Sequence, residues 1–223
     1  MAEGYEMLVV RKAVRRMYIR IRRDRTVVLT VPERTPDAVW QAFADTKKEW
    51  IEAALSEIPA PPAFSYTEGE RHYLLGRPLT LRLREGRKNG CVIEGDMLWL
   101  TVRSREDSQK EKYIEDFWRR ELSLLLTALI EKWAPRLGKA PSGFSIRRMR
   151  SRWGSCRTGS GELTFSLELA AKPVVCIELV VVHELAHLIE RRHSPRFRAV
   201  MSRWLPDWKE RQKALCRFPR EFN

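Results

Sequence analysis

The sequence predicts an α+β protein in which a β-rich N-terminal lobe precedes a largely helical half with a small sheet. Short apolar and β-branched runs, separated by turn-forming residues, fill residues 7–31 and 73–102. From residue 107 onward, apolar residues recur at helical spacing, and three of the four histidines lie within eleven residues of this half. We therefore predict a basic β-rich lobe with one helix over residues 1–105 and a metal-binding catalytic domain over residues 106–223.

The N-terminal lobe is predicted to contain strands, one helix and a linker. Met17, Ile19 and Ile21 alternate with polar residues, and residues 27–31 form a second β-branched run. A helix begins at Thr35-Pro36-Asp37, and its apolar residues follow a spacing near 3.6. These residues are Val39, Trp40, Phe43, Trp50, Ile51 and Leu55. Pro59, Pro61 and Pro62 then mark a linker.

Three further strands are predicted before the helical half, over residues 79–83, 91–93 and 97–102, with glycine-containing turns between them. His72 stands alone at the start of this region and is interpreted as a structural or surface residue.

The second half is predicted to open with a long helix over residues 107–134, which Pro135 and Gly138 stop. Strands over residues 144–149 and 163–169 flank a loop over residues 151–160. A helix begins at Pro173, and because it is apolar on all sides we expect it to be buried despite its valine runs. Two more helices begin at Pro195 and Pro206.

The run His183-Glu184-Leu185-Ala186-His187 predicts a catalytic metal site. Positions i and i+4 of a helix lie about 40° apart around its axis, so both histidines project toward one point. Glu184 lies one position further round, within reach of a water molecule on the same metal. The two histidines would hold a zinc ion, and the carboxylate would deprotonate its water.

His193 is the predicted third ligand. In a continuous helix it would lie roughly 120° from His187 and miss the metal. Ser194-Pro195 has the pattern of an N-cap followed by proline at the first helical position, so a new helix begins there. His193 therefore lies in a connector that can return to the metal. Three protein ligands leave a fourth position for water, as catalytic zinc sites require.

Composition indicates a globular protein of a reducing compartment. Hydrophobic residues make up 43% of the 223 residues, which is enough for a substantial core. The first residues lack the apolar stretch of a secretory signal, and the apolar run over residues 122–130 is too short to span a bilayer. The four cysteines are scattered and indicate free thiols. We expect a cytoplasmic protein without a membrane partner.

The net charge of +13 predicts affinity for polyanions. Arginines cluster in three places, and the last two clusters lie near the metal motif along the chain. The clusters contain Arg15, Arg16, Arg20, Arg22 and Arg23; Arg147, Arg148, Arg150, Arg152 and Arg157; and Arg191, Arg192, Arg196 and Arg198. The clusters near the metal contact an anionic substrate or are simply solvated, and the first suits the solvated face of a strand.

Two C-terminal motifs resemble the YgjP-like family of metal-dependent hydrolases, which are zincin-type metallopeptidase-like proteins similar in their metal helix to SprT-like proteases. The motifs are residues 148–156 (RMRSRWGSC), and residues 180–188 (VVVHELAHL) with 193–197 (HSPRF). The N-terminal basic strands also resemble that family, so the likeness covers nearly the whole chain. It implies a zincin-like catalytic half in which the long helix and the metal helix pack beside a small sheet.

The resemblance implies that His183, His187 and His193 bind zinc and that Glu184 is the general acid/base. Glu190 matches an acidic position, and either orients a ligand or pairs with an arginine. Leu179 stands where the family usually has an aromatic residue, and Ser166 where it usually has asparagine.

Within this likeness, residues 153–156 are expected to form a turn or strand end that faces the metal cleft. Gly154 permits close approach of a substrate backbone. Arg152 holds an anionic group or is a structural ion-pair partner, and Trp153 lines the cleft or anchors the core. Cys156 is expected to be a small buried residue rather than a ligand.

The predicted reaction is hydrolysis, most simply of a peptide in a protein substrate. A second hypothesis is pyrophosphate release from a nucleoside triphosphate, since family members also carry a UTP pyrophosphatase label; no phosphate-binding glycine loop supports it. A third is a nucleic-acid-associated module in which the basic N-terminal lobe binds phosphates. A fourth, a purely structural metal site, fits poorly with Glu184 and an open coordination position. The oligomeric state stays open.

Overall fold

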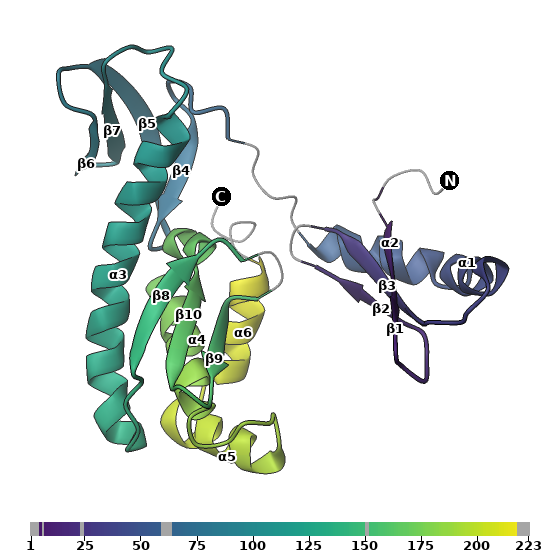
Figure 1. The fold of residues 1–223 in the computed structure, drawn as a ribbon. Helices are drawn as coiled ribbons and strands as arrows, with labels where there is room; N and C mark the ends of the chain where they lie inside the picture. Colours follow the sequence, from purple (N-terminus) through teal and green to yellow (C-terminus); the bar gives the residue numbers. More distant parts are fainter. Residues whose placement is uncertain (1–4, 6, 23–24, 59–63, 150–151, 218–223) are drawn as a thin grey trace. The chain divides into compact units, whose positions relative to one another are not determined.

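The structure is a computed structural model that describes residues 5, 7–22, 25–58, 64–149 and 152–217 (Figure 1). The chain forms two compact units, residues 1–63 and 64–223. The described residues form three small sheets and six α-helices, so the predicted α+β class is confirmed. The predicted linker prolines, together with Arg23, Arg150 and Ser151, lie outside the described residues.

The first unit is a three-stranded sheet with two helices. Its strands are β1 (Met7–Lys12), β2 (Tyr18–Ile21) and β3 (Val27–Pro32). The central strand β3 is parallel to β1 and antiparallel to β2. Alternate side chains of a strand share one face, and the β3 residues Val27, Leu29 and Val31 are fully buried against the helices.

Two helices replace the single helix expected over residues 35–55: α1 (Asp37–Asp45) and α2 (Lys48–Glu57). The chain turns between them, where the Thr46 hydroxyl donates to the Phe43 carbonyl oxygen (2.7 Å). Each helix packs on its own part of the sheet, α1 through Ala44 and α2 through Ile51 and Leu55. Trp50, expected on the apolar face, is 53% exposed.

The second unit begins with a four-stranded sheet in the order β4-β5-β7-β6. The strands are β4 (Arg71–Leu74), β5 (Arg77–Glu85), β6 (Gly90–Glu94) and β7 (Met97–Val102). Their buried leucines share one core cluster with Ile114 and Phe117 of the long helix α3 (Lys110–Leu137). Residues 64–105 therefore pack with the following helices, and the compact units meet at residue 63. The functional division at residue 105 stays a prediction.

The helix α3 continues through Pro135 and ends at Leu137, three residues beyond the expected end. Pro135 lies in the last turn of the helix, so any bend that it causes affects only the final residues. Gly138 has a left-handed conformation (φ 68°), and the Lys139 N–H closes the helix on the Ala134 carbonyl oxygen (3.2 Å).

A second small sheet lies beside α3 in the order β8-β10-β9 (Figure 1). Its strands are β8 (Gly143–Arg147), β9 (Gly154–Arg157) and β10 (Glu162–Ser166). The strand β9 lies within the expected loop over residues 151–160, and it pairs with β10 through a tight turn at Gly161 (φ 74°). The expected strand over residues 163–169 stops at Ser166 and continues as the 3₁₀-helix η1 (Leu167–Ala171).

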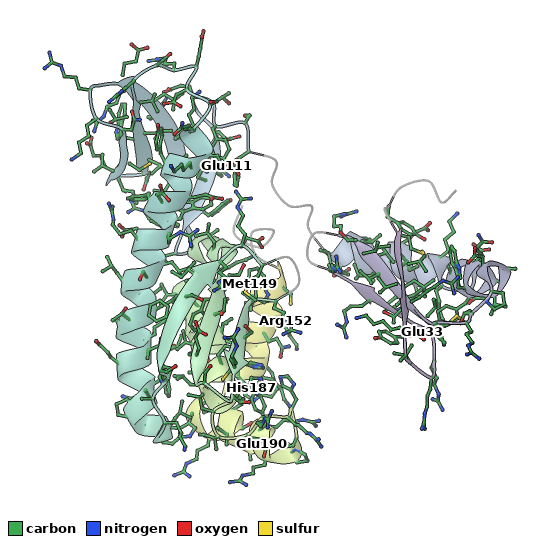
Figure 2. The ribbon with its side chains drawn as sticks, in the orientation of Figure 1. Glu33, Glu111, Met149, Arg152, His187 and Glu190 are labelled. Atoms are coloured by element: carbon green, nitrogen blue, oxygen red, sulfur yellow. The ribbon has the colours of Figure 1, made fainter. Side chains whose placement is uncertain are left out.

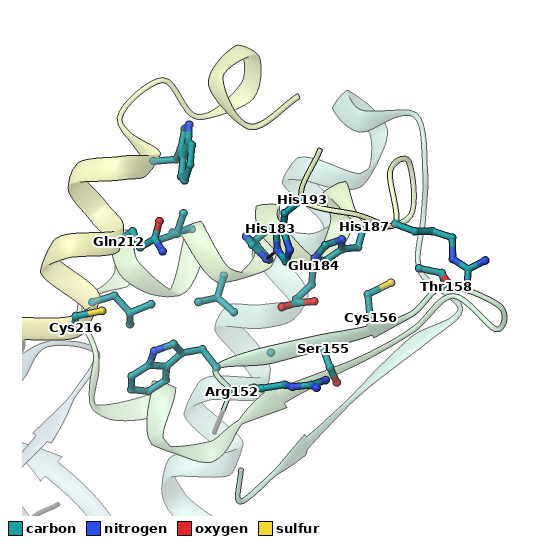
Figure 3. A pocket seen from close by; sticks show the side chains of 17 residues that line it. Arg152, Ser155, Cys156, Thr158, His183, Glu184, His187, His193, Gln212 and Cys216 are labelled. Atoms are coloured by element: carbon teal, nitrogen blue, oxygen red, sulfur yellow. Dashed lines mark hydrogen bonds between the residues drawn. The ribbon is translucent and has the colours of Figure 1, made fainter. Parts of the chain in front are cut away.

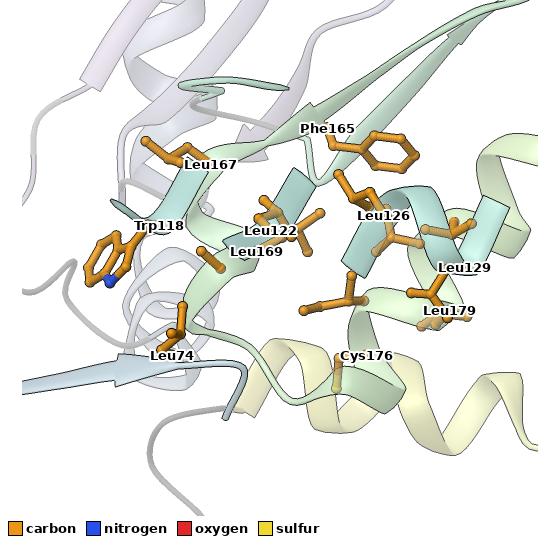
Figure 4. Packing of buried hydrophobic residues seen from close by; sticks show 14 of the residues in the cluster. Leu74, Trp118, Leu122, Leu126, Leu129, Phe165, Leu167, Leu169, Cys176 and Leu179 are labelled. Carbon is orange, nitrogen blue, oxygen red and sulfur yellow. The ribbon is translucent and has the colours of Figure 1, made fainter. Parts of the chain in front are cut away.

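Three helices complete the unit: α4 (Val174–Ala186), α5 (Pro195–Trp204) and α6 (Trp208–Arg217). The expected start of α4 after Pro173 is confirmed. Figure 4 shows Leu126 and Leu129 of α3 packing beside Leu179 of α4. From Cys176 onward the helix is buried as expected, and this burial overrides the β propensity of Val180, Val181 and Val182. Val174 and Val175 in its first turn are exposed (40% and 48%), contrary to the expectation.

Candidate metal centre

The end of α4 and the following connector bring three histidines together (Figure 3). His183 lies in the last turn of α4, and His187 follows immediately after it. The chain then leaves the helix, and His193 returns so that its Nε2 lies 3.0 Å from Nε2 of His183. The three side chains offer one nitrogen each, all within 4.8 Å of one another. The structure thus groups the three residues that the sequence singled out.

The return of His193 depends on the start of α5. The Ser194 hydroxyl accepts a hydrogen bond from the Phe197 N–H (3.2 Å), which is the predicted N-cap. Phe197 is 2% exposed, and its ring centre lies 4.7–5.0 Å from the centres of all three imidazoles. Sequence reasoning missed this residue. The available signal was an aromatic residue in the first turn of an arginine-rich helix.

Glu190 acts on His187 through its backbone. Nδ1 of His187 lies 3.2 Å from the Glu190 carbonyl oxygen, which can only accept, so Nδ1 carries the proton. The other ring nitrogen, Nε2, is then left with its lone pair free for a metal. The Glu190 carboxylate accepts instead from the Arg192 N–H (3.3 Å). The contact to His187 is made by the main chain, and the contact to Arg192 by that residue's backbone N–H, so neither role considered for the Glu190 carboxylate is tested, and both stay predictions.

Glu184 is buried against β9. Its side chain is on the metal helix, and the residue is 5% exposed. Burial raises the pKa of Glu184 to about 8, and the charge of Arg152 opposes this rise. A Cβ added at Gly154 would lie 2.7 Å from Oε1 and Cγ of Glu184. The Glu184 side chain therefore lies closer to the backbone of residue 154 than any residue other than glycine would allow.

The histidines and Glu184 open into a pocket of about 540 Å³ (Figure 3). Residues 152–156 form one wall, so the expected placement of Arg152, Trp153 and Gly154 at the cleft agrees with the structure. The helix α6 forms another wall with Trp208, Gln212, Leu215 and Cys216.

Cys156 also lines this pocket, but the histidine group contains no cysteine. Burial, followed by the charge of Glu184, raises the pKa of the Cys156 thiol to about 11. Cys156 is half-buried instead of buried as expected, and its thiol lies outside the histidine group.

A family model described as "YgjP-like, metallopeptidase domain" matches residues 15–218. The chain belongs to the YgjP-like family. Comparison with curated proteins and with solved structures gave no match. Membership in this family and the histidine cluster together support a metal-dependent peptidase domain.

Four arginines from the two clusters near the metal motif differ in what they contact. Arg152 and Arg191 line the pocket. Arg148 instead forms ion pairs with Glu111 and Glu115 of α3 (Figure 2 labels Glu111), and Arg157 pairs with Glu162 (3.1 Å). Arginines that are close together in the sequence therefore do not all reach the pocket.

One buried carboxylate, Glu178, links α4 to two neighbouring helices in addition to their apolar packing. This side chain accepts hydrogen bonds from Lys132 (2.6 Å) and Trp133 (2.9 Å) of α3 and from Arg211 (2.6 Å) of α6. The contact links the helix that carries His183 to the helix that forms the far wall of the pocket. Sequence reasoning also missed Glu178, because a lone acidic residue in an apolar helix does not reveal its partners.

His72 is fully buried and lies outside the histidine group. Its Nε2 contacts Glu70 (2.9 Å), and its ring stacks on Phe64 (4.4 Å between centres). It is therefore a structural residue, one of the two alternatives the sequence left open. No helix in the described ranges is long and apolar enough to cross a membrane.

Proposed function

We propose that this chain is a zinc-dependent peptidase in which His183, His187 and His193 hold the ion and Glu184 is the general base. The observation that carries the proposal is the placement of three imidazole nitrogens within 4.8 Å of one another, in a pocket that Glu184 also lines. Zincin-like architecture, expected from the resemblance, belongs to the same proposal.

The donor set supports zinc. Three imidazoles suit zinc, whereas magnesium and calcium take oxygen ligands. Nitrogen ligands at about 2.0–2.1 Å from a tetrahedral ion are roughly 3.3 Å apart, which is close to the 3.0 Å between Nε2 of His183 and of His193. When bound, zinc supplies a Lewis acid and lowers the pKa of a water ligand to about 7.

Glu184 would move the proton. Its burial favours the neutral carboxyl, but a cation at the histidines would restore the carboxylate, because a nearby positive charge stabilises the ionised form. The carboxylate could then accept a proton from the attacking water and later return it to the leaving amine nitrogen. Because Gly154 has no side chain, the Glu184 carboxylate can occupy this position beside β9.

The free edge of β9 supports a peptide substrate. The Ser166 N–H donates to the Trp153 carbonyl oxygen (2.9 Å), and Gly154 lies opposite Phe165. Hydrogen-bonded and non-bonded pairs alternate in an antiparallel ladder, so the N–H and C=O of Gly154 and Cys156 point away from β10. An extended peptide could add to this edge as a further strand, which would carry its backbone past Glu184.

A second candidate is a metal-dependent nucleotide pyrophosphatase. Arg152 and Arg191 at the pocket favour it, because arginine pairs well with phosphate. A cluster of carboxylates that would hold magnesium beside a triphosphate does not occur in the described part of the chain. The peptidase therefore ranks first.

The test compares zinc-loaded wild type with Glu184→Gln, which keeps the size of the side chain and removes its basicity. Each protein is incubated with a mixed peptide library, read by mass spectrometry, and with UTP, read by pyrophosphate release. Glu131→Gln on the exposed surface of α3 is the matched control.

We expect peptide cleavage by wild type and Glu131→Gln, and a loss of cleavage in Glu184→Gln that still holds one zinc ion. Pyrophosphate release that is lost in Glu184→Gln would favour the pyrophosphatase over the peptidase as the function of the site. If all three proteins gave the same results in both assays, Glu184 would have no catalytic role and the metal would be structural.

A further inference from the structure

The N-terminal unit separates its charges between the strands and the helices. The described acidic residues of this unit all lie in the turn after β3 or on α1 and α2: Glu33, Asp37, Asp45, Glu49, Glu52 and Glu57. The described part of β1, β2, β3 and their connections carries only cations: Arg11, Lys12, Arg15, Arg16, Arg20, Arg22 and Arg25. The helix side also carries Lys47 and Lys48, which reduce its negative charge, so a polyanion would be attracted mainly to the strands.

Two of these cations serve the unit itself. Arg11 contacts Asp37 (2.6 Å) and the carbonyl oxygens of Glu33 and Thr35, and Arg25 contacts the carbonyl oxygens of Leu55 and Ile58.

The remaining five, Lys12, Arg15, Arg16, Arg20 and Arg22, have no side-chain hydrogen bond or ion pair with any described residue. Their charges are available to a partner outside the unit.

The sheet face opposite the helices carries an aromatic and aliphatic strip beside these cations. The register places Val10, Thr30 and Tyr18 in one row across the sheet, and Leu8, Val28 and Arg20 in the next. These residues alternate with the side chains that pack against α1 and α2, so they lie on the other face. Tyr18 and Leu8 are each 42% exposed, whereas Val28 and Thr30 of the central strand are buried (8% and 5% exposed). The accessible apolar part of this face is therefore Tyr18 and Leu8 with the half-buried Val10.

We propose that this face, defined as Leu8, Val10, Lys12, Tyr18 and Arg20 with the neighbouring Arg15, Arg16 and Arg22, binds single-stranded nucleic acid. Single strands expose base faces that stack on an aromatic ring, and their phosphates pair with surrounding cations. A duplex hides its base faces, so it would use the cations and leave Tyr18 and Leu8 without a partner. This function is independent of the metal and goes beyond peptide hydrolysis.

The experiment uses the full-length chain and fluorescence anisotropy with a labelled 20-nucleotide oligothymidylate, an oligouridylate and a duplex of equal length. The test variant is Arg15→Glu/Arg20→Glu. Two variants with the same change in charge are the controls: Lys47→Glu/Lys48→Glu at the exposed start of α2, and Arg196→Glu/Arg198→Glu on the exposed surface of α5. Tyr18→Leu removes the ring and keeps an apolar side chain, and thermal unfolding checks that every variant is folded.

We expect single strands to bind more tightly than the duplex. Arg15→Glu/Arg20→Glu should weaken binding at least about tenfold and reduce the slope of log K against log salt by about 1.4, since each phosphate contact on a single strand contributes about 0.7. Tyr18→Leu should weaken binding about tenfold with little change in this slope, because stacking is not a charge interaction.

Equal weakening by all three charge variants would show that overall charge alone attracts the strand, and would overturn the proposal. Stronger weakening by the α5 variant, unchanged binding by Tyr18→Leu, or equal affinity for the duplex would also overturn it. None of these outcomes bears on peptide cleavage, which is measured separately.

Discussion

Glu178 offers a sharp test of how the metal helix is held. Its carboxylate is 12% exposed and accepts hydrogen bonds from two positively charged side chains and one indole. Burial by itself would raise the pKa of Glu178, but the hydrogen bonds from Lys132, Arg211 and Trp133 outweigh burial and lower the pKa to about 2. The ionised form is therefore strongly favoured in the folded chain.

The magnitude follows from this pKa. A fall from 4.5 to about 2 corresponds to about 3 kcal/mol, because each pKa unit equals about 1.4 kcal/mol. Lys132 is 46% exposed, so solvent weakens its part, and we take about 2 kcal/mol as the working value. Since the folded pKa is depressed, this contribution is fully present above pH 4.5 and is lost as the pH falls from 4.5 toward 2.

The assay is urea unfolding of wild type and Glu178→Gln between pH 3 and pH 7, with Glu131→Gln as the exposed control. We expect Glu178→Gln to be less stable by about 2 kcal/mol at pH 7, with the gap closing as the pH falls below 4.5. Comparing the two proteins at each pH removes the effect of the other carboxylates. A gap near zero at pH 7, or a gap that does not change with pH, would refute this account of Glu178.

Three further predictions concern the site itself. Gly154→Ala should cut peptide cleavage about 100-fold while zinc content stays at one per chain, because the added Cβ displaces the Glu184 carboxylate by roughly 1 Å; unchanged steady-state rates would contradict the close contact. Phe197→Ala should lower the free energy of unfolding by about 3–5 kcal/mol and weaken zinc binding, since the ring supports all three imidazoles; urea unfolding and zinc titration would detect both changes, and full zinc affinity would count against that support. A chelator should lower the melting temperature, as a thermal scan can measure. Zinc at 100 times its dissociation constant should raise the free energy of unfolding by about 2.7 kcal/mol. A melting temperature that changes with neither addition would mean that the folded chain does not bind zinc.

The metal motif was predictable because its signals are local. The spacing of His183 and His187 fixes their common face on a helix, and Ser194-Pro195 marks where the next helix begins. Both depend on backbone geometry within a few residues. This geometry predicted a connector in which His193 can return to the other two histidines, and the likeness to the YgjP-like family implied the same grouping.

Other features depend on contacts between distant segments and could not be predicted. The strand β9 is four residues long and contains glycine, and it becomes a strand because β10 pairs with it. The break between α1 and α2 follows from two separate clusters on the sheet. Likewise, the sheet over residues 71–102 packs on α3, so it belongs to the same compact unit as the helices that follow it.

The central claim is that His183, His187 and His193 hold a catalytic metal that leaves a position open for water. Crystals of the zinc-loaded chain, measured on both sides of the zinc absorption edge, test it most directly. The account predicts one anomalous peak, about 2.0–2.1 Å from a nitrogen of each histidine, with Glu184 nearby but not bound to the ion. An anomalous peak elsewhere would contradict it. So would an ion at the three histidines whose fourth coordination position is filled by Glu184 or Cys156.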